Sequence, residues 1–90
     1  MTNPKEEIKI YGTLWCGDTR RARKFFEDNQ IEYDWIDIDT DAAAADYVMS
    51  LNNGCRSVPT ILFPDGTILV EPSTLELMTK FNITDYRANP

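Results

Sequence analysis

The chain has 90 residues, of which 42% are hydrophobic and 27% are charged, and its formal net charge is -6. The length and the apolar content predict one domain over residues 1–90 and argue against a disordered chain. The negative charge argues against nucleic-acid binding, because most of the surface would repel a polyanion. The chain contains no histidine, which excludes Cys–His nucleophile pairs and histidine-dependent zinc sites. We expect neither a metal site nor a bound cofactor.

The amino-terminal residues contain no apolar segment of the signal-peptide type, and no apolar run reaches membrane-spanning length. The two cysteines, Cys16 and Cys55, lie far apart and do not form the pattern of a disulfide-stabilised secreted domain. These features predict a reduced, cytoplasmic protein that does not contact a membrane, and we expect it to be a monomer.

The first part of the chain predicts a strand followed by a helix. Residues 1–6 are polar and are expected to form a disordered lead. Polar and apolar residues alternate in 7–11, which predicts a short strand that ends at Gly12. Residues 18–30 carry apolar side chains at helical spacing, which predicts an amphipathic helix. These apolar residues are Ala22, Phe25 and Phe26.

The central part predicts a second strand and a second helix. Residues 31–39 are rich in β-formers and alternate in polarity, which is typical of a strand. Residues 42–52 contain four alanines and predict a helix, with Asp39 or Thr40 as its cap. Asn53-Gly54 is a turn dipeptide that ends this helix.

The last part predicts a hairpin and a third helix. Residues 57–63 lead into a buried strand, 64–67 have the composition of a hairpin turn, and 68–70 form the returning strand. Pro72-Ser73 opens the final helix. Its apolar residues are Leu75, Leu77, Met78 and Phe81.

The order of these elements predicts the fold class. Two strands separated by a helix pair in parallel through a right-handed crossover, and the hairpin adds an antiparallel pair. We therefore expect an α/β fold in the order β-α-β-α-β-β-α, with a four-stranded mixed sheet and three helices. The core is expected to span about residues 7–80, and 82–90 carry no clear element.

Cys16 is the candidate catalytic residue, because it lies where the first helix is predicted to begin. The free amides and the dipole of a helix start favour a thiolate, whereas the nearby Asp18 opposes it. We expect the pKa of Cys16 to lie modestly below the usual value of about 8.5. The alternative is a buried structural cysteine. Four basic residues follow, and they either attract anionic partners or form an ordinary solvated helix face; they are Arg20, Arg21, Arg23 and Lys24.

Several motifs, in this order, resemble the glutaredoxin family. Trp15–Thr19 is similar to the active-site turn of that family, and Gly54–Thr60 is similar to its loop with a cis-proline. Pro64–Thr67 and Pro72–Thr74 resemble the hairpin and the last-helix start of its short bacterial, mycoredoxin-like members. The resemblance covers about residues 7–80 and implies a thioredoxin-like fold.

The resemblance also implies roles around the active-site turn. Cys16 would be the nucleophile, with Trp15, Gly17 and Asp18 supporting it. Thr19 stands where dithiol members carry a second cysteine, so a one-thiol mechanism is implied. The Thr19 hydroxyl could donate a hydrogen bond to Cys16, or Thr19 could be an ordinary helix residue. A second cysteine, Cys55, is either a resolving thiol or an incidental loop residue.

A groove for a low-molecular-weight thiol is implied as well. Arg56 would bind a carboxylate of the thiol, Val58 would offer its backbone before the cis Pro59, and the helix start at Ser73 and Thr74 would bind a γ-glutamyl group. Two departures leave the thiol open among glutathione, mycothiol and bacillithiol. A lysine common in glutathione-binding members is replaced by Thr13, and Glu71-Pro72 replaces a frequent Gly-Gly pair.

The predicted function is a monothiol thiol–disulfide oxidoreductase. Such a protein reduces mixed disulfides between proteins and a low-molecular-weight thiol, which acts as co-substrate. Two alternatives are a [2Fe–2S] carrier or sensor, which Gly17 favours and Asp18 does not, and a redox-silent domain that binds a peptide in the cis-proline groove.

Overall fold

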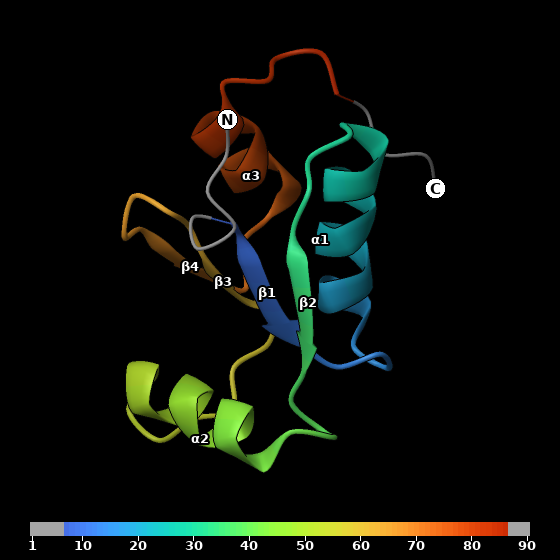
Figure 1. The fold of residues 1–90 in the computed structure, drawn as a ribbon. Coiled ribbons are helices and arrows are strands. Elements are labelled where there is room, and N and C mark those ends of the chain that lie inside the picture. The colour runs from blue at the N-terminus through green and yellow to red at the C-terminus, as the bar shows by residue number, and fades with distance from the viewer. Residues whose placement is uncertain (1–6, 87–90) are drawn as a thin grey trace.

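The computed structural model describes residues 7–86 and contains four strands and three helices in the predicted order. Figure 1 shows their arrangement. The elements are β1 (Lys9–Gly12), α1 (Gly17–Asp28), β2 (Asp34–Asp37), α2 (Ala42–Leu51), β3 (Thr60–Leu62), β4 (Ile68–Val70) and α3 (Thr74–Phe81). The predicted fold class is therefore confirmed. The expected lead at residues 1–6 lies outside the described residues.

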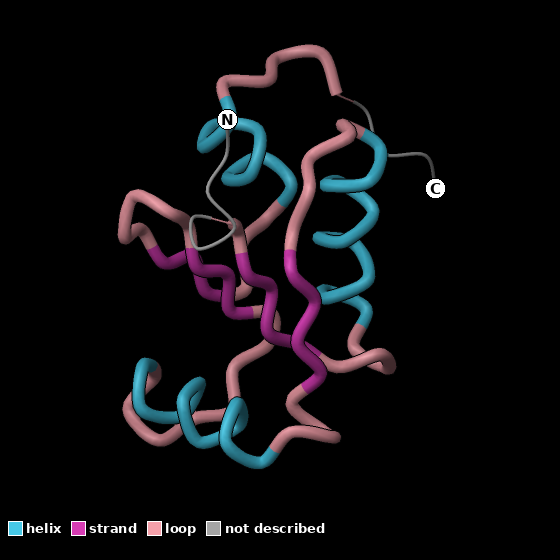
Figure 2. The backbone as a smooth tube through the Cα atoms, viewed as in Figure 1, coloured by secondary structure: helices cyan, strands magenta, loops and turns pink. Residues whose placement is uncertain are grey.

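The sheet is mixed and has the strand order β2-β1-β3-β4. β1 pairs in parallel with β2 and antiparallel with β3, so Ile10 lies between Trp35 on one side and Ile61 on the other. β3 and β4 form the predicted antiparallel hairpin. Because of these directions, the loops after β1 and β2 and the loop before β3 meet at one end of the sheet, as the loop segments in Figure 2 show.

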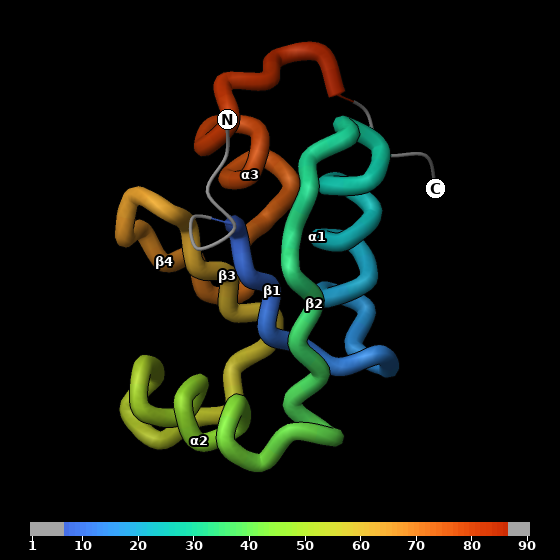
Figure 3. The backbone as a smooth tube through the Cα atoms, in the orientation of Figure 1, coloured from blue at the N-terminus to red at the C-terminus, as the bar shows by residue number. Residues whose placement is uncertain are grey.

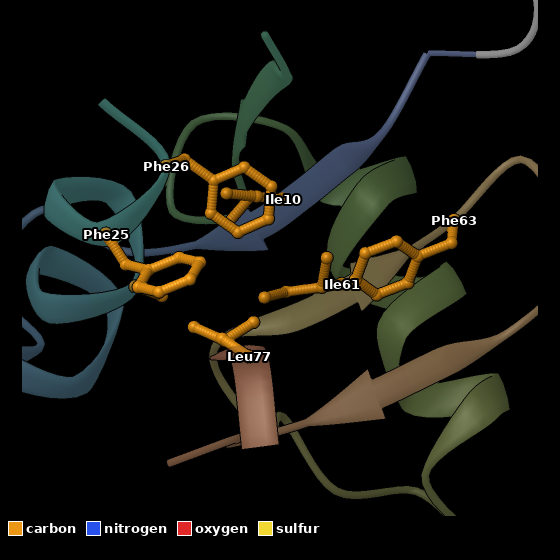
Figure 4. Packing of buried hydrophobic residues seen from close by; sticks show 7 residues of the cluster. Ile10, Phe25, Phe26, Ile61, Phe63 and Leu77 are labelled. Carbon is orange, nitrogen blue, oxygen red and sulfur yellow. The ribbon is translucent and has the colours of Figure 1, made fainter. Parts of the chain in front are cut away.

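α1 and α3 cover one face of the sheet and enclose the larger core. The apolar side chains of this face point toward one another, as Figure 4 shows. Phe25 and Phe26 of α1 are completely buried, and Phe26 contacts Phe81 of α3 edge-to-face, with ring centroids 5.4 Å apart. The helical spacing of these aromatic residues is therefore explained by a core that they share with the sheet. The remaining buried members are Ile10, Ala22, Ile61, Phe63 and Leu77.

α2 covers the opposite face of the sheet, and the path of the chain from β2 to this face can be followed in Figure 3. Small side chains, Ala44 and Ala45, let the helix backbone approach the sheet closely, and Val48 is fully buried beside them. The alanine run thus has a packing reason in addition to its helix propensity.

Two local details differ from the prediction. Asp41, rather than Asp39 or Thr40, caps α2, since its carboxylate accepts a hydrogen bond from the Ala44 amide at 3.1 Å. The second strand is limited to β2, because a turn at residues 38–40 follows it.

The apolar face of α3 and the carboxyl-terminal limit of the core also differ from what the sequence predicts. Leu77 is buried, but Leu75 is 70% exposed, because side chains two positions apart on a helix point in nearly opposite directions. The core extends beyond residue 80, since the Tyr86 ring packs against the Phe25 ring with their centroids 4.9 Å apart. Residues 82–86 contain no helix or strand, as expected. Within the described range, no helix is long and apolar enough to cross a membrane.

Candidate active site

Cys16 occupies the N-cap position of α1, with extended backbone dihedrals of φ -78° and ψ 123°. A turn after β1 places it there, because its amide bonds to the Thr13 carbonyl at 3.4 Å. Its own carbonyl accepts the first helical bond, from the Arg20 amide at 3.1 Å. The thiol makes no capping hydrogen bond, so it does not satisfy the first-turn amides that have no partner within the helix.

The thiol faces the loop that precedes β3. Cys16 Sγ lies 3.8 Å from the Val58 carbonyl oxygen and donates a hydrogen bond to it. The Val58–Pro59 peptide bond is cis, and Pro59 is buried. The Thr60 hydroxyl holds this loop by donating to the Ser57 carbonyl at 2.7 Å. The sheet therefore brings together a helix start and a loop that are far apart in sequence.

A cavity of about 230 Å³ lies next to this contact. Its lining consists of Thr13, Trp15, Ile38, Asp39, Arg56 and Val58. A larger cavity of about 490 Å³ lies at the opposite end of the sheet, around Ile8, Phe63 and Phe81, and none of the predicted site residues lines it. We assign the site to the smaller cavity, because it adjoins the only predicted nucleophile.

Polar contacts join three of the residues that line the smaller cavity. The Trp15 indole Nε1 donates to Asp39 Oδ2 at 2.8 Å, and Arg56 Nη2 lies 3.6 Å from Asp39 Oδ1. Arg56 also donates to the Ile38 carbonyl at 3.4 Å. Arg56 therefore lines this cavity, and the carboxylate of Asp39 lies beside its guanidinium group.

Three residues of the cavity lining, Thr13, Ile38 and Asp39, are not among the site residues that the sequence predicts. The sequence indicates Asp39 only as a helix cap. Its place just after a strand that pairs in parallel was a usable signal, because ligands of α/β sheets bind at the carboxyl ends of such strands. The sequence marks Thr13 only as a replacement for a lysine, but the structure shows that it is 2% exposed and lines the cavity. Its hydroxyl has no hydrogen-bond partner among the described residues.

Thr19 does not donate a hydrogen bond to Cys16. The side chain is completely buried, and its hydroxyl has no partner within residues 7–86. It packs against Gly12 of β1 instead, where an added Cβ would lie 2.6 Å from Thr19 Cγ2 and 2.8 Å from Thr19 Oγ1. Thr19 thus has a structural role under the active-site turn.

This contact predicts that Gly12→Ala lowers the free energy of unfolding by about 1–3 kcal/mol, because the buried Thr19 cannot move aside. In a Thr19→Ala background, the same change should cost less than about 0.5 kcal/mol. Urea unfolding of the four proteins in this cycle measures both values. Gly17→Ala is the matched control, since a Cβ at Gly17 meets nothing within 4 Å. Equal stability of the two glycine variants would contradict the packing.

Most of the basic residues after Cys16 have partners on the surface of α1. Arg21 pairs with Asp18, and Lys24 Nζ donates to Asp28 Oδ2 at 2.9 Å. Hydrogen bonds from Lys24 and then Tyr86 hold the pKa of Asp28 below its ordinary value. These contacts fit the interpretation of a solvated helix face. Arg23 forms a cation–π pair with Trp35 of β2, in which Arg23 Cζ lies 4.2 Å from the centroid of the ring.

Ser73 and Thr74 start α3 as predicted, but they do not line the cavity. The Ser73 hydroxyl accepts from the Glu76 amide at 3.1 Å, while the Glu76 carboxylate accepts from the Ser73 amide at 3.0 Å. This capping box uses groups that could otherwise bind an anion. The start of α3 is held near the loop of Pro59, because the Glu71 amide donates to the Pro59 carbonyl at 2.8 Å.

Cys55 is exposed, forms no disulfide with Cys16 in this structure, and is not part of the cavity lining. Among residues 7–86 there is no group of three or more histidine, cysteine or acidic side chains that could hold a metal ion. The chemistry that the site supports is therefore that of a single thiol beside a small, partly polar cavity.

Comparisons with known proteins agree with this fold. The family model described as Glutaredoxin matches residues 8–68. The chain is 44% identical over 73 residues to "Putative glutaredoxin Rv3198A" of Mycobacterium tuberculosis, with 81% of this chain and 87% of that protein covered. It is 40% identical over 73 residues to "Mycoredoxin 1" of Corynebacterium glutamicum, with coverage of 81% and 90%.

A solved structure shows the same fold. A mutant of the thioredoxin-like protein BC3987 matches with a TM-score of 0.75 and 24% identity, over 88% of this chain and 99% of that one. At this identity the match shows the fold alone. The family is shown by the family model, which spans more than half of the chain, and by the two relatives, which are at least 40% identical over 81% of the chain. The chain belongs to the glutaredoxin family of thiol–disulfide oxidoreductases.

Proposed function

We propose that this protein is a monothiol oxidoreductase that reduces mixed disulfides between proteins and a low-molecular-weight thiol through Cys16. The observation that carries the proposal is the position of the Cys16 thiol, at a helix start and 3.8 Å from the Val58 carbonyl at the edge of the cavity. The buried Thr19 supports a one-thiol mechanism, because a hydroxyl cannot release a disulfide-bound product by thiol exchange.

The reaction consists of two thiol exchanges. The Cys16 thiolate attacks the small-thiol sulfur of the mixed disulfide, a new S–S bond forms on Cys16, and the protein substrate leaves as a thiolate. A second molecule of the small thiol, as its thiolate, then attacks that sulfur. The small thiol leaves as its symmetrical disulfide, and the Cys16 thiolate is restored. Overall, one free small thiol is consumed, one protein thiol is regenerated, and the small-thiol half of the mixed disulfide leaves joined to the second small thiol as a symmetrical disulfide.

The groove that receives the small thiol is proposed to include Arg56, Val58 and Pro59, which adjoin the cavity or its loop. Trp15 would form the exposed side of the entrance, since its ring is 70% exposed and tethered to Asp39. Ser73 and Thr74 belong to the proposal only through their remaining backbone amides, because the Ser73 hydroxyl serves the capping box. We propose a monomer that acts in the cytoplasm on protein mixed disulfides.

Mass spectrometry of the intact protein tests this function. After incubation with oxidised glutathione, and with the disulfides of mycothiol and bacillithiol, we expect one thiol adduct per chain, located on Cys16 by peptide mapping. The Cys55→Ser variant should form the same adduct. A chain that remains unmodified with all three disulfides would contradict the proposal. Loss of the adduct with loss of two hydrogens would instead identify Cys55 as a resolving thiol.

A further inference from the structure

Both carboxylate oxygens of Asp39 contact other residues of the cavity lining. Oδ2 accepts from Trp15 Nε1 at 2.8 Å, and Oδ1 lies 3.6 Å from Arg56 Nη2. The backbone of Asp39 is held as well, because its amide donates to the Asp37 carboxylate at 2.9 Å. Asp39 therefore ties the segment before Cys16 to the loop before Pro59, and its carboxylate has a defined place.

The charges of the cavity lining cancel. Among its described lining residues, Arg56 is the one cation and Asp39 is the one anion. A ligand carboxylate that binds Arg56 must displace the Asp39 carboxylate or lie next to it. Like charges at such short distance repel each other, and this repulsion is an effective means of rejecting a class of ligand.

The lining instead suits an uncharged polar group. The Thr13 hydroxyl is buried, lines the cavity and has no partner among residues 7–86. A buried hydroxyl without a hydrogen bond is costly, so a ligand hydroxyl or amide that reaches it gains a bond that residues 7–86 do not supply. Ile38 and Val58 provide the apolar remainder.

We propose that Asp39 is a specificity-determining residue, which occupies Arg56 and thereby disfavours thiols that place a carboxylate in this cavity. The inference rests on the proposed function, because it concerns the small thiol of that reaction. It also gives Asp39 a second role as a positioning residue for Trp15, whose indole would otherwise be free to turn.

Binding of two unreactive probes tests the proposal. The probes are S-methylglutathione and its diethyl ester, in which both carboxylates are blocked, and binding is followed by NMR chemical-shift titration. Wild-type protein should favour the free acid by less than about twofold. Asp39→Asn should bind the free acid about five- to tenfold more tightly and the ester within about twofold of wild type, because one repelling charge is removed. Asparagine retains an oxygen that can accept from Trp15, so the variant separates charge from position.

The Arg56→Gln background distinguishes a local effect from a general change in net charge. In Arg56→Gln, adding Asp39→Asn should no longer tighten binding of the free acid, whereas a long-range charge effect would persist. Equal changes for both probes, no change for either, or no binding of the free acid by Asp39→Asn would overturn the inference.

The outcome is separate from that of the proposed function. The probes contain neither a free thiol nor a disulfide, so these titrations do not depend on Cys16 chemistry. An unmodified Cys16 in the mass measurement would overturn the oxidoreductase proposal, while the titrations would still decide whether Asp39 controls Arg56.

Discussion

Cys16→Ser is expected to reduce the rate of mixed-disulfide reduction by more than about a thousandfold, because removal of an essential nucleophile leaves only background reaction. A serine hydroxyl is protonated at neutral pH and does not exchange with disulfides. The other cysteine, Cys55, is not among the residues that line the cavity beside Cys16. The measurement is the release of a fluorescent glutathione derivative from a carrier-protein mixed disulfide, with each candidate small thiol as reductant.

Cys55→Ser is the matched control, since it makes the same chemical change at an exposed position outside the cavity lining. Its rate should stay within about twofold of wild type, as is usual for exposed residues away from a reacting group. A large loss of activity in Cys55→Ser, or substantial activity in Cys16→Ser, would show that the one-thiol mechanism is wrong.

Phe26→Ala is expected to lower the free energy of unfolding by about 3–5 kcal/mol, the range found when a buried aromatic ring is removed. Phe26 is 0% exposed and makes edge-to-face contacts with Tyr33 and Phe81, each with ring centroids 5.4 Å apart. Since a small domain is stable by only about 5–15 kcal/mol, a large part of the total would be lost. Urea unfolding followed by circular dichroism measures the change in midpoint and slope.

Leu75→Ala provides the control for this prediction. Leu75 is also a large apolar residue in a helix, but it is 70% exposed. Its replacement should change the free energy of unfolding by less than about 0.5 kcal/mol. If the two variants were equally destabilised, the division between buried and exposed faces of the helices would be incorrect.

The sequence alone determined the order of the elements and the position of Cys16 at a helix start. The signals for these elements are local. The spacing of Ala22 and Phe26 indicates the first helix, the turn at Pro64–Thr67 separates the hairpin strands, and Asn53-Gly54 follows the end of the second helix. Cys16 lies between the first predicted strand and the first predicted helix, so local signals also put it at a helix start. The resemblance to glutaredoxins added the cis peptide bond before Pro59, which the structure contains.

Only the tertiary structure decided how the residues around Cys16 are used. Aspartate is a residue type that commonly caps helices, but Asp41 and not Asp39 caps α2. The Asp39 carboxylate accepts a hydrogen bond from Trp15, which lies 24 residues away in the sequence. Thr19 could have turned toward Cys16, but the close approach of Gly12 buries it. Capping and turn preferences depend on neighbours in sequence. The partners of a carboxylate or a hydroxyl in a cavity depend on which loops the sheet brings to the same end, and no local pattern contains that information.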